Sequence, residues 1–213
     1  NCTFVARRGN LLLVGTEGVS LRKGDLRGNS LYASFDHGVT FAPVPQPVYE
    51  TVEGSRLPGL VAQRCAFDEE YLYVSFSANG PHSQNVERGY TCDCGDCSCG
   101  RIARYPLLPG GLGAPEDITP EKGNWGFSAM DARHGLLVTA TIHRQDGDAV
   151  YLSQDQGRSW RKVLHGLDTG RMEFRLSYMK PCYNSGGNLI HWLTDVKMDP
   201  HRPGTAWFNT GTG

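Results

Sequence analysis

Four short apolar segments with strand-like character recur along the chain, and this repeat limits the possible fold more than any other feature. They are residues 11–16, 71–77, 136–142 and 205–210. When Leu12, Leu72, Leu137 and Ala206 are taken as equivalent, successive segments are 60, 65 and 69 residues apart. Self-similarity at such a period is the sequence signature of a repeat architecture. The chain is therefore expected to repeat one small β-unit.

Each repeat carries further signals around its apolar segment. A second strand-like segment follows at residues 30–34, 101–105 and 149–153. Short phrases that end in aspartate precede the last three apolar segments, at 66–68, 129–131 and 197–199. The order strand, aspartate turn, strand, long loop, strand is typical of a propeller blade. Long loops that recur on one face usually build a binding surface.

These patterns predict an all-β fold made of four-stranded antiparallel propeller blades. Residues 1–213 hold about three blades and part of a fourth, with approximate periods 12–71, 72–136 and 137–205. Residues 171–180 alternate apolar and polar side chains and are expected to form another strand. The alternative is a β-sandwich with irregular strand spacing.

Two segments share the pattern Ser-x-Asp-x-Gly-x-Ser/Thr-aromatic, and each follows a predicted strand. They are residues 34–41 (SFDHGVTF) and 153–160 (SQDQGRSW). An aspartate in a hairpin turn can accept hydrogen bonds from turn amides, and glycine adopts the positive φ that other residues resist. The last aromatic side chain is expected to pack against the next strand. We therefore predict structural rather than catalytic roles for these residues: Ser34, Asp36, Gly38, Phe41, Ser153, Asp155, Gly157 and Trp160.

This pattern resembles the Asp-box (BNR repeat) of sialidases, sortilin-type receptors and several glycosidase propellers. The intervening sequence resembles family 74 glycoside hydrolases, the xyloglucanases, in unbroken order. The matching segments are residues 79–81 (NGP), 100–105 (GRIARY), 116–120 (EDITP), 125–131 (WGFSAMD), 137–144 (LVTATIHR), 191–200 (HWLTDVKMDP) and 207–213 (WFNTGTG). The resemblance implies seven-bladed propellers and hydrolysis of the β-1,4-glucan backbone of xyloglucan, with inversion.

An inverting glycosidase needs one carboxylic acid and one carboxylate about 6.5 to 9.5 Å apart. In the family, one catalytic aspartate lies near the start of the first propeller and the other in a later G-D-x-G-G-F passage. Neither motif occurs in this sequence, which begins with Asn1 rather than methionine. We therefore expect an internal segment that lacks both catalytic acids and is inactive alone.

The resemblance also suggests residues that contact sugar, in or beside the long loops. Sugar clefts combine aromatic faces with planar hydrogen-bond donors. The candidates are Trp125, His143, Arg144, Tyr178 and Trp192. Packing between blades is the alternative for the two tryptophans. Asp146 and Asp148 could form an acidic pair near Arg144, but a solvated loop is the favoured interpretation.

Seven cysteines include four within residues 92–99: Cys92, Cys94, Cys97 and Cys99. Their spacing could wrap a zinc ion, although most zinc sites pair ligands from separate strands. Disulfides or unpaired thiols are favoured over metal, and no cofactor is expected.

Charge and hydropathy exclude several partners. Twenty-one basic residues against 22 acidic ones give a net charge of −1, which argues against nucleic acid and anionic membranes. No apolar stretch of 18 residues could span a bilayer as a helix. The expected partners are an uncharged polysaccharide and the rest of the chain's own propeller. The protein is expected to be secreted, with a cytoplasmic location left open. A sortilin-like binding module and a sialidase-type glycosidase are the alternative functions.

Overall fold

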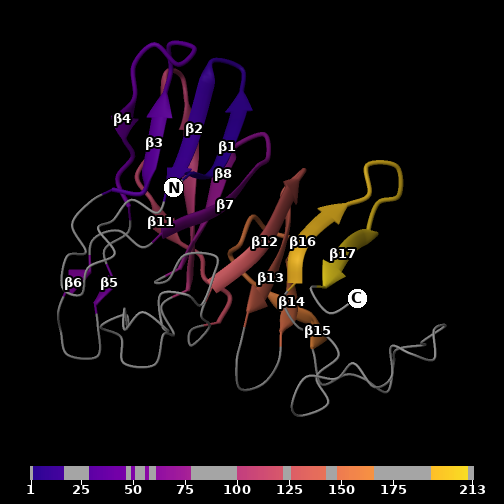
Figure 1. The fold of residues 1–213 in the computed structure, drawn as a ribbon. Helices are drawn as coiled ribbons and strands as arrows, with labels where there is room; N and C mark the ends of the chain where they lie inside the picture. The colour runs from indigo at the N-terminus through magenta and orange to yellow at the C-terminus, as the bar shows by residue number, and fades with distance from the viewer. Residues whose placement is uncertain are drawn as a thin grey trace.

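The structure is a computed structural model that describes residues 2–16, 29–46, 49–50, 56–57, 61–77, 100–121, 126–142, 148–165 and 193–210 (Figure 1). These residues form strands and turns without any helix, so none of them belongs to a helix that could cross a membrane. The predicted all-β class is confirmed. Three of the repeated segments form strands with the predicted bounds: β2 (Leu11–Thr16), β8 (Tyr71–Ser77) and β13 (Leu136–Ile142). The strand predicted over 171–180 lies outside the described residues.

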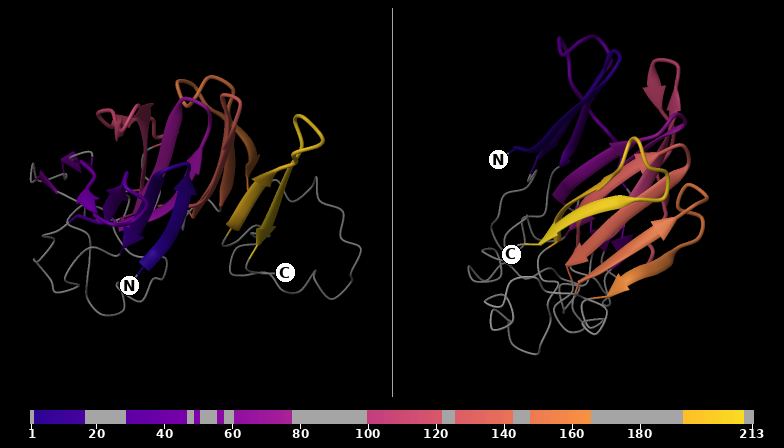
Figure 2. Two further views of the ribbon diagram at one scale, coloured as in Figure 1. Left: turned by 90° about the horizontal axis from the view of Figure 1, so that it is seen from above. Right: turned by 90° about the vertical axis from the view of Figure 1, so that its right-hand side faces the viewer.

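The strands form antiparallel sheets that follow one another along the chain, as Figures 1 and 2 show. The first sheet contains β1 (Cys2–Arg8), β2, β3 (Leu31–Ser34) and β4 (Ala42–Pro43). The second contains β7 (Val61–Phe67), β8, β9 (Arg101–Leu108), β10 (Gly111–Leu112) and β11 (Glu116–Asp117). The third contains β12 (Gly126–Arg133), β13, β14 (Ala149–Ser153) and β15 (Arg161–His165). The terminal hairpin is β16 (Leu193–Met198) with β17 (Ala206–Thr210), and β5 (Tyr49–Glu50) pairs separately with β6 (Arg56–Leu57).

The first strand of each of the three larger sheets and of the terminal hairpin carries a β-bulge near its start. The register shifts at Thr3, Gln63, Ser128 and Thr194. Counted from these bulges, Leu12, Leu72, Leu137 and Ala206 pair with equivalent residues of their first strands. The bulge thus provides a common reference position for comparing residues of different sheets.

Apolar clusters fill the space between successive sheets. Leu13 and Leu31 of the first sheet pack with Val74 and Tyr105 of the second. Tyr73 of the second sheet shares a cluster with residues of the third. The third sheet in turn packs against the terminal hairpin. Each sheet therefore has a leading face toward the preceding sheet and a trailing face toward the following one.

The connections separate into two ends of the sheets because every sheet is antiparallel. Short turns join β1 to β2, β7 to β8, β12 to β13, β3 to β4 and β14 to β15 at one end, called here the turn end. At the opposite end, called the loop end, β2, β8 and β13 finish and β3, β9 and β14 begin. The chain also passes from one sheet to the next at the loop end.

One of the three aspartate phrases does not form a turn. Asp68 and Asp199 follow β7 and β16, and their side chains accept hydrogen bonds from the backbone amides of Glu70 (2.9 Å) and His201 (2.8 Å). Asp131 instead lies within β12 and accepts a 2.8 Å bond from the amide of Met198. The prediction of an aspartate turn is wrong in this repeat because β12 continues to Arg133 and the chain turns at His134 and Gly135.

Candidate functional site at the loop end of the sheets

The predicted sugar contacts lie outside the described residues. This applies to all five: Trp125, His143, Arg144, Tyr178 and Trp192. The four clustered cysteines, Cys92, Cys94, Cys97 and Cys99, also lie outside them. These site assignments stay predictions.

The strand ends that adjoin three of those positions lie together at the loop end. Gly126, which follows Trp125 in the chain, pairs with Ile142, which precedes His143. The Ser128 hydroxyl donates to the carbonyl oxygen of Leu193, the first residue of β16. The backbone therefore brings these three strand ends side by side, although they are far apart in the sequence.

The bulge residues connect neighbouring sheets at this end. The Thr3 Oγ1 hydroxyl donates a 2.5 Å hydrogen bond to the carbonyl oxygen of Ala62, which directly precedes the next bulge residue. Ser128 makes the equivalent contact with Leu193, which directly precedes Thr194. Gln63, the bulge residue of the second sheet, contacts the Ser77 hydroxyl at the end of β8 instead. Bulges often re-aim side chains beside active sites. A bulge is recognised from the pairing register of two strands, so the sequence alone gives little indication of it.

Asp148 corrects the expectation of a solvated loop. Its side chain is buried at the loop end, immediately before β14 begins. Its neighbour Ala149 donates from its backbone amide to the Thr141 hydroxyl at 3.0 Å. Asp146, the other member of the suggested acidic pair, lies outside the described residues.

The two Ser-x-Asp-x-Gly segments, called here the first and second box turns, fold alike at the turn end. In the second, the Ser153 hydroxyl donates to Asp155 at 2.8 Å and accepts from the Gly157 amide at 2.7 Å. Ser159 donates to the same carboxylate from its amide (2.8 Å) and its hydroxyl (2.6 Å). In the first box turn, Ser34, Asp36, Gly38 and Thr40 make the corresponding bonds.

These bonds favour the ionised form of both aspartates. The hydroxyl and amide of Ser159 lower the pKa of Asp155 to about 2. Bonds from Thr40 hold the pKa of Asp36 well below its usual range. A general acid must keep its proton near the working pH. Neither carboxyl group suits that role.

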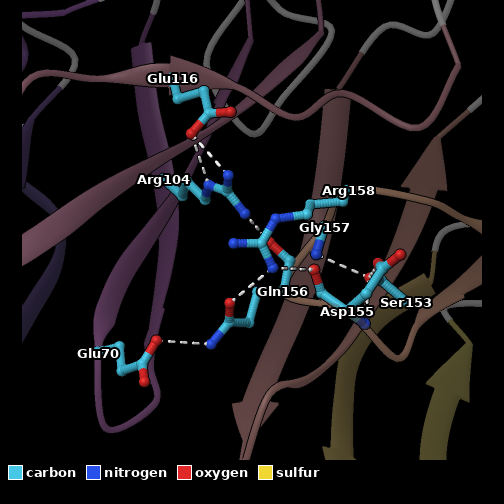
Figure 3. Close-up of polar contacts among 8 residues, drawn as sticks. All are labelled: Glu70, Arg104, Glu116, Ser153, Asp155, Gln156, Gly157 and Arg158. Atoms are coloured by element: carbon cyan, nitrogen blue, oxygen red, sulfur yellow. Dashed lines mark hydrogen bonds and ion pairs between the residues drawn. The ribbon is translucent and has the colours of Figure 1, made fainter.

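The second box turn is held against the second sheet by a network of polar contacts (Figure 3). Buried Arg104 forms an ion pair with Glu116 at 2.7 Å and donates a 2.8 Å bond to the Gln156 carbonyl oxygen. The Gln156 side chain donates to Glu70 at 2.8 Å. These contacts join two sheets through the backbone of the box turn.

The terminal aromatic residues of the box turns behave differently from expectation. Trp160 packs against the preceding sheet rather than the next strand, and its indole nitrogen donates a 2.8 Å bond to the Ile118 carbonyl oxygen. Phe41 is exposed. The predicted packing against the next strand is therefore wrong for Trp160, because the box turn leans toward the second sheet.

The described residues offer little to a sialidase mechanism, which needs free arginines and a reactive tyrosine beside a glutamate. Tyr151 does donate a hydrogen bond to Glu121, which also pairs with Lys162 at 2.9 Å. However, burial, with help from Glu121, raises the pKa of Tyr151 to about 12, which disfavours the phenolate character that a tyrosine nucleophile needs. Arg104 is committed to its contacts with Glu116 and Gln156.

A groove elsewhere in the described structure differs from the proposed sugar cleft. A groove of about 510 Å³ runs between the third sheet and the terminal hairpin, with walls that include Leu136, Val150, Leu152 and Phe208. Arg133, His134 and Asp199 also line the groove, which places it toward the turn end rather than among the long connections of the loop end. No group of three or more potential metal-binding side chains occurs among the residues that the structure describes.

Comparisons with known proteins agree on the fold. No protein-family model matches the chain, and a search of curated proteins gives no match. A GH74 xyloglucanase from Xanthomonas campestris superposes with a TM-score of 0.61 at 21% identity, over 96% of this chain and 25% of that one. A GH74 enzyme from Niastella koreensis gives a TM-score of 0.60 at 19% identity, over 100% of this chain and 28% of that one.

The chain thus spans about a quarter of the length of the structures it matches. At these identities the likeness shows the fold alone: successive antiparallel sheets arranged as in the β-propellers of GH74 enzymes.

Proposed function

We propose that this chain is part of a glycoside hydrolase that acts on xyloglucan or a related β-1,4-glucan. The observation that carries the proposal is the superposition of nearly the whole chain on two GH74 enzymes. The convergence of the long connections at one end of the sheets supports it, because catalytic and binding residues concentrate on loops held by a rigid scaffold.

In this proposal the described sheets are scaffold, and the loop end contacts the glucan. Trp125, His143, Arg144, Tyr178 and Trp192 bind sugar rings and hydroxyls. Two carboxyl groups outside this segment carry out the inverting hydrolysis. The sheets pack against the remainder of the same propeller, and the protein is secreted to reach an extracellular polysaccharide.

Xyloglucan digestion by the parent protein tests the activity, with carboxymethylcellulose and mixed-linkage glucan as comparison substrates. We expect xyloglucan to be cleaved fastest, with inversion visible by NMR of the newly formed anomeric centre. If xyloglucan is untouched while another β-glucan is cleaved, the proposed substrate is wrong.

The 213-residue chain alone tests the assignment of its role. It should retain xyloglucan without hydrolysing it, because both catalytic acids lie elsewhere. A measurable hydrolysis rate would contradict the absence of catalytic acids. Specific retention of a peptide but not of xyloglucan would favour the sortilin-like alternative.

A further inference from the structure

Asp148 is an ionisable side chain buried at the loop end, beside a connection that the proposed function assigns to sugar binding. It is 0% exposed and directly precedes β14. Aspartate is almost never fully buried unless hydrogen bonds or an opposite charge compensate it, because removing a carboxylate from water costs free energy. The third sheet therefore keeps an energetically costly group at its loop end.

The other two sheets show that the fold itself does not require a carboxylate at this position. In each sheet the position lies five residues before the third-strand partner of the aligned leucine, so Asp148 is equivalent to Asn29 and Gly100. The Asn29 side-chain amide donates to the carbonyl oxygen of Leu31 in its own sheet. Gly100 has no side chain at all. Two sheets thus form with an uncharged residue here, and the charge of Asp148 is particular to the third.

The backbone around Asp148 is held in place on both sides of the connection 143–147. Ile142, which precedes the connection, pairs with Gly126 of β12. Ala149, which follows Asp148, donates from its amide to the hydroxyl of buried Thr141 at 3.0 Å. Asp148 therefore lies on fixed backbone at the base of this connection. A locked side chain on such a support can orient the groups that contact a ligand.

The basic residue nearest to Asp148 in the sequence is Arg144, four positions earlier and outside the described residues. Arginine suits a buried ion pair, because its planar guanidinium can pair with a carboxylate and still keep N–H donors for other groups. We propose that Asp148 is a positioning residue whose carboxylate pairs with the Arg144 guanidinium and directs its remaining donors to sugar hydroxyls. This inference rests on the proposed function, which places Arg144 in the glucan site.

The test is the steady-state hydrolysis of xyloglucan by the parent protein and its Asp148→Asn variant. The substitution removes the charge with little change in size, and Asn29 shows that the fold accepts asparagine at this position. We expect KM to rise about tenfold while kcat changes little, because the lost contact binds substrate and transition state alike. Arg144→Gln should have the same effect, since it removes the donor itself.

A double variant tests whether the two residues act as a pair. Asp148→Asn combined with Arg144→Gln should raise KM about tenfold, rather than about a hundredfold, because either substitution alone breaks the same interaction. Asp131→Asn is the matched control. Asp131 belongs to the same sheet but accepts a bond from the Met198 amide nearer the turn end, so its loss should leave KM unchanged. Circular dichroism checks that each variant folds.

An unchanged KM in Asp148→Asn, with xyloglucan still cleaved, overturns the positioning role and leaves the proposed function intact. A rise of about a hundredfold in the double variant overturns the pair, because the two residues would then act independently. An Asp148→Asn variant that does not fold also overturns the inference, since the carboxylate would serve the fold. So does a control variant that raises KM equally. A wild-type protein that cleaves no β-glucan overturns the proposed function, and this inference with it.

Discussion

Gly38 and Gly157 occupy the same place in the two box turns, but only Gly157 is also confined by a neighbouring sheet. Both have positive φ, 91° and 87°. A Cβ on Gly157 would lie 2.5 Å from Ile118 Cδ1, whereas a Cβ on Gly38 would meet Leu12 Cδ2 at 3.3 Å. The box pattern predicts the backbone requirement for glycine. It does not predict the contact with Ile118, because that contact depends on how two sheets pack.

Alanine substitution should separate these two requirements. We expect Gly38→Ala to lower the free energy of unfolding by about 1 kcal/mol, through the unfavourable φ alone. Gly157→Ala should cost about 2 to 4 kcal/mol, because overpacking against Ile118 is added. Urea denaturation measures both. Measured in the Ile118→Ala background, the cost of Gly157→Ala should fall toward that of Gly38→Ala, because the overpacked side chain is gone. Equal losses for the two single variants would contradict the contact.

The box carboxylates predict a loss of stability in acid. The pKa of Asp155 falls from 3.8 to about 2 on folding, so the folded chain binds this proton less tightly than the unfolded chain. The stabilisation is therefore complete above about pH 4 and is lost as the pH falls through about 2. Thermal unfolding of wild type and Asp155→Asn should differ most above pH 4 and converge near pH 2. A constant difference across this range would contradict the assignment.

At the level of strands, the sequence predicted correctly those features that depend on residues within one sheet. The apolar segments around Leu12, Leu72 and Leu137 have the composition of buried strands, and the structure places them as second strands. The predicted aspartate turn failed at Asp131, whose hydrogen-bond partner, Met198, lies in another sheet. The bulge at Ser128 was missed for a similar reason: a bulge is a mismatch between two strands, and neither strand alone specifies it.

The bulge contact at Ser128 should stabilise the junction between the third sheet and the terminal hairpin. Ser128→Ala removes the donor to the Leu193 carbonyl oxygen and should lower the free energy of unfolding by about 1 to 2 kcal/mol. Hydrogen exchange should accelerate in β16 more than in β2. Ser128→Thr is the control, because Thr3 makes the same type of bond. Equal exchange in β16 for the alanine variant and wild type would show that the bond does not hold this junction.

Across the whole molecule, the box-turn contacts between sheets and the long connections proposed to bind glucan lie at opposite ends of the sheets. In the three larger sheets and the terminal hairpin, the turn between the first two strands lies at the turn end, while the chain enters and leaves at the loop end. The inter-sheet contacts at Arg104 and Trp160 belong to the turn-end side of this arrangement. Residues of the long connections can therefore vary without disturbing the contacts at Arg104 and Trp160, although the bulge contacts of Thr3 and Ser128 also join sheets at the loop end. The sequence could predict candidate residues in these connections, but not their arrangement, because long connections do not specify their own conformation.

This separation predicts that two tryptophans affect different properties. Trp125→Ala should weaken the binding of xyloglucan oligosaccharides about tenfold, the loss expected when about 1.4 kcal/mol of sugar stacking is removed. Its effect on the free energy of unfolding should be small, because the proposed sugar contacts lie in or beside the long connections. Trp160→Ala should show the opposite result. It should lower the free energy of unfolding by about 3 kcal/mol and leave the sugar affinity unchanged, since Trp160 packs against the second sheet and donates to the Ile118 carbonyl oxygen. Isothermal titration calorimetry and urea denaturation measure the two properties on the same samples. If a folded Trp160→Ala chain lost as much sugar affinity as Trp125→Ala, the functional separation of the two ends would be wrong.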